Sequence, residues 1–454
     1  AVLLLALADG LFWQQKLGIS IAIFAMVFSG IIVVLRPAET SRKTWCAVMG
    51  FAALANLPVI EMAQGVSVLI SGLGVISLAV WAANDRIVQL GQGVATILKL
   101  SVFGPVLLAL GVQDVVKKSG PASGVRKQLM AMILPAAVGA VFIGLLAAAN
   151  PFLENALETL SQIEFLSLNM FERVFFWAAV LVLVLPYLNL RPFKAVQPGS
   201  VRIKTPDGRF PSLVNTASVR NSLILFNGIF ALQSGLDMLV LTGGMTLPEG
   251  MSYASYAHRG AYPLVVTALL AGAFAVGTRR LIQNNRLLRG LIFVWLAQNL
   301  FLVATAAFRL NLYIEQYALT RLRMVAFIWM LLVFIGLVLV AIQIAKHKRN
   351  DWLIKRNLLA LISVIYVCGF VNFSYVIADY NITHKDAQKW FDAPYLCSLG
   401  PQALPVLLKA QKGAISPYCG RLDMPDAPQI AGWRDWGFRN WRLRRYLLVH
   451  KAKG

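Results

Sequence analysis

Long apolar runs separated by short polar segments repeat along almost the whole chain. Each run approaches the roughly 20 residues that an α-helix needs to cross a bilayer. A shorter apolar run that ends near Trp13 adds one more crossing. The pattern therefore predicts an all-α, polytopic transmembrane helix bundle of about 11 spans. The longer runs lie at about residues 17–35, 44–62, 66–83, 129–149, 174–189, 221–243, 261–277, 288–308, 325–345 and 357–372.

Composition agrees with a membrane protein. Of the 454 residues, 58% are hydrophobic and only 14% are charged, whereas soluble domains average about 45–50% and 25%. Residue 1 is alanine and begins directly in an apolar run, so we expect further sequence upstream. Residues 1–13 have neither a basic start nor a small-residue cleavage site, so they do not resemble a signal peptide.

Lysine and arginine gather in alternate loops, which predicts the orientation of the spans. Cytoplasmic loops carry the excess of basic residues, so the N-terminus is expected in the cytoplasm and residues 373–454 form an extracytoplasmic tail. Residues 1–372 then form the bundle. The basic loops contain Arg36, Arg42, Lys43, Lys117, Lys118, Arg126, Lys127, Arg191, Lys194, Arg202, Lys204, Arg209, Arg279, Arg280, Arg286, Arg289, Lys346, Lys348, Arg349, Lys355 and Arg356.

Three segments do not follow the spanning pattern. Val94–Val112 contains Lys99 and Pro105, and a crossing here would place two basic loops on opposite sides, so we expect an interfacial or re-entrant helix. Leu153–Leu168 is predicted to be a second interfacial helix, because Glu154, Glu158 and Glu164 interrupt its apolar residues. In the cytoplasmic loop 190–220, alternating residues around Pro-Asp-Gly at 206–208 indicate a small β-hairpin.

The charge and motif content disfavours several function classes. The net charge is +22, but the basic residues form short clusters rather than an aromatic-lined stripe, so nucleic acid is not an expected partner. No CxxC, HExxH or CxxCH pattern is present, and no GxSxG elbow or complete phosphate-binding loop. We expect neither a metal nor a cofactor, and we favour a non-enzymatic protein.

Asp237 is the most unusual residue inside a predicted span. It shares one helical face with Asn227 and Ser234, with Gln233 nearby. An ionisable side chain facing lipid costs several kcal/mol, so this face is expected to point into the bundle. Two interpretations are open: a substrate or coupling carboxylate, or a helix-packing contact such as a partner for an arginine.

A polar cluster, Leu247–Leu264, lies between two apolar runs. It contains Glu249, Tyr256, His258 and Arg259, flanked by glycines that permit sharp backbone turns. His258 can titrate near neutral pH, and Arg259 can hold a carboxylate, a phosphate or a lipid headgroup. The alternative is structural, with interfacial anchoring and a Glu249 to Arg259 ion pair.

A second outward segment, Phe308–Arg323, repeats this composition with Arg309, Glu315 and Arg321. With the first cluster and Asp237 it would enclose a pocket on the outward face. The alternative is an interfacial segment whose arginines reach lipid headgroups, which we favour for Arg323.

Two of the four cysteines, Cys397 and Cys419, lie in the predicted tail. In an oxidising periplasm they can form a disulfide. Two free thiols remain the alternative.

Several separated segments combine polar, aromatic and glycine residues in a distinctive way. They are Asn227–Asp237, Leu247–Met251, Tyr256–Leu264, Leu312–Glu315, Tyr317–Arg323 and Phe391–Pro405. These segments closely resemble a family of bacterial polytopic membrane proteins labelled domain of unknown function 4173. The resemblance implies a bacterial cytoplasmic (inner) membrane location but no established chemistry. The usual pattern of that family has a glycine where Ala318 stands, and it lacks a cysteine at position 397.

Three functions are consistent with these features. The first is a non-enzymatic sensory, scaffold or complex-associated component that binds a ligand, a lipid or another membrane protein through its outward face. The second is a secondary transporter coupled through Asp237, although no inverted repeat is evident. The third is a lipid-linked transferase with Glu249 or His258 as the base.

Overall fold

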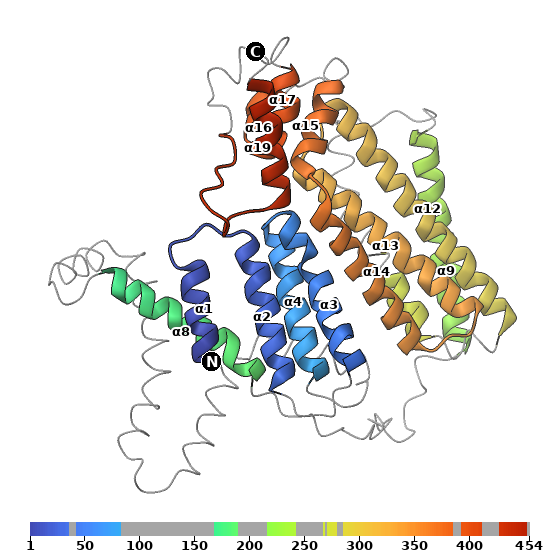
Figure 1. Ribbon diagram of the computed structural model, residues 1–454. Coiled ribbons are helices and arrows are strands. Elements are labelled where there is room, and N and C mark those ends of the chain that lie inside the picture. Colours follow the sequence, from blue (N-terminus) through green and yellow to red (C-terminus); the bar gives the residue numbers. More distant parts are fainter. Residues whose placement is uncertain are drawn as a thin grey trace, which may run out of the picture. The chain divides into compact units, whose positions relative to one another are not determined.

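The structure is a computed structural model that describes residues 1–35, 42–82, 168–188, 216–241, 267, 270–278, 285–384, 392–410 and 426–451. All regular elements in these ranges are helices. The chain divides into two compact units: Ala1–Gln197 with Ile430–Trp441 form unit 1, and Pro198–Gln429 with Arg442–Gly454 form unit 2. Figure 1 shows the helices of both units coloured along the chain.

Unit 1 packs around α2, α3 and α4, which contact one another (Figure 1). The approach of α3 and α4 is close because Gly74 has no side chain; a Cβ there would lie 2.5 Å from the Cβ of Ala55. A polar contact accompanies it, in which Ser71 donates to Asn56 Oδ1 at 2.7 Å. The helices of the unit are α1 (Val2–Phe12), α2 (Ile19–Val34), α3 (Arg42–Glu61), α4 (Gly65–Ala82) and α8 (Leu168–Leu188).

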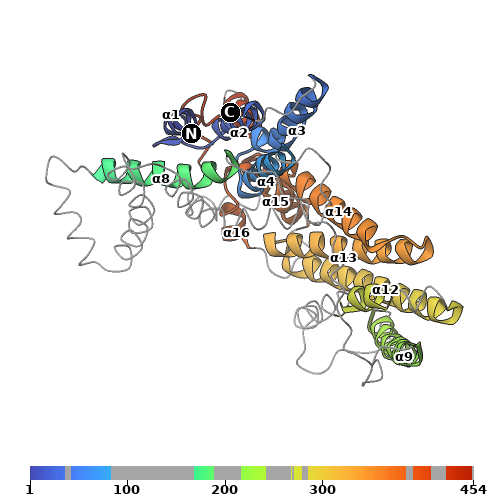
Figure 2. The same cartoon turned by 90° about the horizontal axis from the view of Figure 1, so that it is seen from below.

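Unit 2 is built on four long helices: α9 (Thr216–Leu241), α12 (Arg286–Tyr317), α13 (Arg321–Ala345) and α14 (Asn350–Phe370). Figure 2 shows α12, α13 and α14 side by side. Trp295 of α12 lies at the centre of an aromatic cluster with Phe226, Phe230 and Phe274, at centroid distances of 5.0, 5.7 and 5.7 Å. Burial of these rings joins α9, α12 and the helical segment 270–277 into one core.

Short connections make α12, α13 and α14 an antiparallel series, with turns at residues 318–320 and 346–349. By contrast, α9 and α12 run parallel, since Asn227 contacts the start of α12 and Asp237 contacts its later part. Side chains cap two of these helices: Asn285 accepts from the first turn of α12, and Thr320 accepts from the first turn of α13.

The C-terminal part of the chain consists of shorter helices. They are α15 (Phe373–Thr383), α16 (Ala393–Cys397), the 3₁₀ helix η3 (Pro401–Ala403), α17 (Leu404–Ala410) and α19 (Phe438–Lys451). In unit 2, α15, α16 and α17 share a small core with Ile314 of α12 and Leu319. Within unit 1, Ile19 donates its backbone N–H to Trp436 O at 2.8 Å.

Four described helices are long and apolar enough to cross a membrane: Thr216–Leu239, Arg286–Tyr317, Arg321–Ala345 and Asn350–Phe370. Val2–Phe12, Ile19–Val34, Trp45–Glu61 and Gly65–Trp81 are shorter apolar helices. The described residues are thus all-helical, with the long apolar helices of an integral membrane protein. The predicted total of 11 spans also depends on residues outside the described ranges, which include the run 129–149, the segment 94–112, residues 153–167 and the proposed hairpin at 201–210.

Candidate functional site

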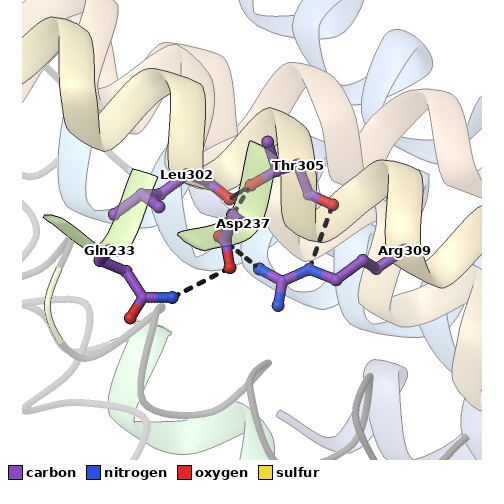
Figure 3. A network of polar contacts seen from close by, with 5 residues as sticks. All are labelled: Gln233, Asp237, Leu302, Thr305 and Arg309. Carbon is purple, nitrogen blue, oxygen red and sulfur yellow. Dashed lines mark hydrogen bonds and ion pairs between the residues drawn. The ribbon is translucent and has the colours of Figure 1, made fainter. Parts of the chain in front are cut away.

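Among the described residues of unit 2, the most deeply buried charged side chains form an ion pair between α9 and α12 (Figure 3). Arg309 Nη2 lies 3.0 Å from Asp237 Oδ2, and the two side chains are only 7% and 1% exposed. Gln233 Nε2 donates to the other oxygen of Asp237 at 3.0 Å. The Thr305 hydroxyl lies 3.4 Å from Asp237 Oδ2 and 3.0 Å from Leu302 O, and its single proton is available to either acceptor. The carboxylate therefore has a cation, an amide and a hydroxyl within hydrogen-bond distance.

Helical periodicity places these donors. Gln233 and Asp237 are four residues apart on α9, and Thr305 and Arg309 are four apart on α12, so each pair shares one face of its helix. Arg309 Nε also donates to the carbonyl of Thr305 at 3.4 Å, which orients the guanidinium along α12. The parallel packing of the helices brings the two faces together.

A second polar contact lies in the same interface between α9 and α12, more than two turns before Asp237 along α9. We call this interface the α9–α12 seam. Asn227 Nδ2 donates to the carbonyls of Leu223 and Leu291, at 2.7 and 3.0 Å. Gln298 Nε2 donates to the carbonyl of Asn227 at 3.2 Å. Asn227 and Asp237 thus both face α12, while Ser234 is half-buried. Because hydrogen bonds between helices hold spans together in lipid, this seam fixes the register of α9 against α12.

The turn between α12 and α13 forms the second part of the site. Ala318 has φ 68° and ψ 164°, a conformation that glycine adopts far more readily than alanine. Next to it, the buried Asn381 of α15 accepts from Leu319 N at 2.6 Å and donates to Leu319 O at 2.9 Å. One side chain thereby satisfies both backbone groups of a turn residue.

Two arginines bind the backbone around this turn. The backbone N–H of Arg321 donates to the hydroxyl of Tyr395 at 2.9 Å, and its guanidinium donates to Leu399 O at 3.0 Å. The Arg323 guanidinium donates to Tyr317 O and Ala318 O and lies 4.2 Å from the ring centroid of Tyr313. The segment that contains Tyr395 and Leu399 is therefore docked on the turn.

Glu315 is exposed at the end of α12 and accepts from Asn311 Nδ2 at 2.6 Å. Burial raises the pKa of the Tyr380 phenol above its usual value, and the negative charge of Glu315 raises it further. The ring of Tyr380 stacks on His384 with centroids 4.3 Å apart. Glu315 thus lies close enough to the aromatic pair of Tyr380 and His384 for its charge to influence Tyr380.

Of the eight predicted binding residues, the structure places Asp237 with Arg309, and Glu315 and Arg321 near the turn that ends α12. Glu249, Tyr256, His258 and Arg259 lie outside the described residues, so the proposed wall of the pocket formed by Leu247–Leu264 remains a prediction.

Unit 1 has an acid and arginine pair that the sequence did not suggest. Arg173 of α8 binds Asp9 of α1 through two nitrogens, with Nε to Oδ1 at 2.9 Å. Trp177 Nε1 donates to the same carboxylate at 2.8 Å. The Arg173 and Asp9 side chains are 45% and 18% exposed. The signal that could have found the pair was one acid within an otherwise apolar run.

A third pair joins α3 to the start of α19 within unit 1. Arg439 Nε donates to Glu61 Oε1 at 3.1 Å, with the arginine 3% and the glutamate 18% exposed. The neighbouring backbone approaches very closely, since a Cβ on Gly18 would lie 2.4 Å from the carbonyl carbon of Asp435. Only glycine fits at this position without a shift of one backbone.

Comparison with known protein families identifies a match over most of the chain. The model for the domain of unknown function DUF4153 covers residues 22–410 of the chain, which include the buried pair and the turn. The chain belongs to the DUF4153 family. Comparisons with curated proteins and with solved structures found no match.

Membership of DUF4153 corrects the resemblance to the family labelled 4173, which was wrong. Arginines, tyrosines and glycines recur in the turns of polytopic proteins because they suit the bilayer interface. Short motifs of this composition therefore identified the class of protein but not the family. DUF4153 membership brings no known chemistry, so the function has to be inferred from the geometry.

The remaining site predictions concern cysteines and metals. Cys397 is buried and takes part in a disulfide. Cys419 lies outside the described residues, so the Cys397 to Cys419 pairing remains a prediction; Cys46 and Cys368 are free thiols. Within the described ranges of this DUF4153 protein, no group of three or more His, Cys, Asp or Glu residues is arranged to hold a metal ion.

Proposed function

We propose that this protein is a non-enzymatic component of the bacterial inner membrane that binds a ligand or a partner protein through its outward face. The observation that carries the proposal is the docked turn. Side chains from α15 and α16 bind the backbone of residues 319–321, and Arg321 in return binds Leu399 O. Such dense bonding to backbone groups builds a rigid polar platform at the end of the spans.

The charge distribution supports an outward position for this platform. The opposite end of the α12 to α14 series carries Arg289 at the start of α12 and Lys346, Lys348 and Arg349 in the α13–α14 connection. Arg289 donates to His347 Nε2 at 3.1 Å, so these basic segments lie together. By the positive-inside rule this end is cytoplasmic, and the turn at residues 318–320 then faces the periplasm.

The proposal also explains the two kinds of polar residue on α12. Arg309 and Thr305 are buried and bind Asp237, so they fix the helix that supports the platform. Glu315 lies beyond them and is exposed. A binding residue needs such access, so Glu315 is the first residue that we would expect to contact a partner.

Native mass spectrometry of the full-length protein in discs cut directly from its own membrane tests the proposal. We expect a molecule or protein at fixed stoichiometry that is lost in the Glu315→Gln/Arg321→Gln variant. The matched control is Asp351→Asn/Lys355→Gln, which alters an exposed acid–base pair at the basic end. A wild-type protein without any such companion, or equal loss in both variants, would overturn the proposal.

A secondary transporter coupled through Asp237 is the second candidate, because this carboxylate is buried in a helix long enough to span the membrane. A coupling cation would have to replace Arg309 at Asp237 during transport. Proteoliposome flux that falls with Asp237→Asn, but not with Glu315→Gln, would favour transport over partner binding.

A further inference from the structure

We propose that the disulfide at Cys397 is a lock that completes the platform, so that the binding face forms only in the oxidised protein. Cys397 is the last residue of α16 and is 8% exposed within the small core that α15, α16 and α17 share (Figure 1). It takes part in a disulfide. The inference rests on the binding function proposed above, because it concerns the regulation of the same platform.

The partner of Cys397 follows by elimination. The chain contains four cysteines, and Cys46 and Cys368 are free thiols. Cys419, which lies outside the described residues, is the remaining cysteine of the chain. A bond between positions 397 and 419 closes a loop that contains η3 and α17, which restricts the conformations open to α16 when this helix leaves the core.

The helix α16 needs such a restriction because it is too short to be stable alone. It has five residues, whereas isolated helices shorter than about 12 residues are marginal in water. Its local support includes Asp392, which accepts from Tyr395 N at 2.9 Å, and Ser398, which donates to Tyr395 O at 2.7 Å. Its docked position therefore has to be maintained by contacts from elsewhere in the fold.

The contact between α16 and the turn lies on both sides of Cys397. The Tyr395 hydroxyl accepts from Arg321 N at 2.9 Å, and Leu399 O accepts from the Arg321 guanidinium at 3.0 Å. Each of these two groups is two residues from Cys397. Ser374 of α15 also donates to Leu399 O at 2.9 Å. A covalent bond at Cys397 thus acts between the two groups that hold Arg321.

Thiol–disulfide exchange with a disulfide-bearing oxidant closes the lock. The thiolate of one cysteine attacks the oxidant, and the second cysteine then displaces it. Two protein thiols become one disulfide, and their two electrons and two protons pass to the oxidant, which becomes a dithiol. Thiols stay reduced in the cytosol but form disulfides in the periplasm, so the platform is completed after residues 373–454 have crossed the membrane. Burial of Cys397 then shields its sulfur from other thiols.

Hydrogen exchange resolved to single amides tests the lock, because two amides of the turn have different partners. Arg321 N belongs to the first turn of α13, where amides have no partner within the helix, and it donates to Tyr395 of α16. Leu319 N donates to Asn381 of α15. In the full-length Cys397→Ser variant, exchange at Arg321 should rise about tenfold or more, while exchange at Leu319 changes little.

Two comparisons accompany this variant. Cys368→Ser removes a free thiol from α14 and should leave both amides at their wild-type rates. Reduction of the wild-type protein with dithiothreitol should reproduce the pattern of Cys397→Ser, so the test does not depend on the folding of one variant. Equal protection of Arg321 N in the oxidised and reduced proteins would overturn the lock. So would exchange that rises equally throughout α14, because the loss would then be general.

Alkylation in denaturant checks the bond itself. The wild-type protein should have two free thiols, and Cys397→Ser should have three because Cys419 is released. Four free thiols in the wild-type protein would refute the lock. Native mass spectrometry then separates the lock from the proposed function. A companion that stays bound after reduction contradicts control of binding by the disulfide, whereas a wild-type protein without a companion overturns the proposed function alone, since the exchange rates still decide the lock.

Discussion

Two acid–arginine pairs, one in each unit, share a chemistry and differ in their surroundings. Asp237 and Arg309 in unit 2 are 1% and 7% exposed and have two further donors within hydrogen-bond distance, Gln233 and Thr305. Asp9 and Arg173 in unit 1 are 18% and 45% exposed, with Trp177 as a further donor. The presence of an acid–arginine pair therefore does not by itself determine its contribution to stability. Loss of one partner should cost little where the pair is exposed and much where the remaining charge stays buried.

Removing half of the buried pair should produce the largest effect. Arg309→Leu leaves the Asp237 carboxylate buried without its cation, which should lower the free energy of unfolding by about 3–5 kcal/mol. Unfolding in mixed detergent micelles measures this change. The Asp237→Leu/Arg309→Leu variant should recover most of the loss, because both charges of this pair are then removed together. A double variant as unstable as the single one would refute the interpretation that burial dominates.

The pair between Glu61 and Arg439 is intermediate in burial and provides a third point between the two aspartate pairs. Glu61→Gln keeps a hydrogen-bond acceptor but removes the charge opposite an arginine that is 3% exposed. We expect a loss of about 2 kcal/mol, since hydrogen bonds to charged groups contribute about 1.5–3 kcal/mol. The same unfolding assay should rank this variant between the two aspartate pairs. Any other rank would show that exposure is a poor guide to the energy of these contacts.

A substitution in unit 2 that changes no charge tests the contribution of backbone conformation to stability, apart from that of the ion pairs. Ala318→Gly should raise the free energy of unfolding by about 1 kcal/mol, because glycine relieves the conformation at φ 68° and its greater freedom when unfolded offsets only part of the gain. Thermal unfolding followed by fluorescence provides the measurement. Ala307→Gly, within helical α12, is the control and should destabilise. Equal destabilisation by both would contradict the assigned turn.

The exposed pair should give the smallest effect. Asp9→Asn retains an acceptor for Trp177, and Arg173 remains accessible to solvent or headgroups, so the loss of stability should be the smallest of the series. In the wild-type protein, high salt should reduce the contribution of the Asp9–Arg173 pair to the free energy of unfolding. The contribution of the buried Asp237–Arg309 pair should change little. Measuring both pairs at low and high ionic strength checks this. A larger loss for Asp9→Asn than for Glu61→Gln would reverse the proposed order.

The helices could be predicted because lipid leaves the backbone few alternatives. Every N–H and C=O group in the bilayer core needs an internal partner, so an apolar run of sufficient length becomes a helix. The run at 288–308 accordingly lies within α12, which extends further at both ends to Arg286 and Tyr317. The part of α12 that extends to Tyr317 packs through Ile314 against α15, α16 and α17, a contact that no local sequence pattern encodes.

Side-chain partners were less accessible from sequence. An arginine was one of the partners considered for Asp237, but choosing Arg309, 72 positions away, requires the register of α9 against α12. Asn381 gave no signal, because its role depends on the backbone of Leu319 being presented to it. The short motifs likewise indicated a polytopic membrane protein but pointed to the wrong family.

The pairing of Glu61 with Arg439 has a consequence for how the protein is made. The two residues are 378 positions apart, so their contact can form only after the intervening chain has been synthesised and inserted. Contacts of such long sequence separation form late and slowly. An incomplete product would leave Glu61 and the backbone around Gly18 uncovered, and would differ from the finished protein at a surface that cellular proteases can recognise.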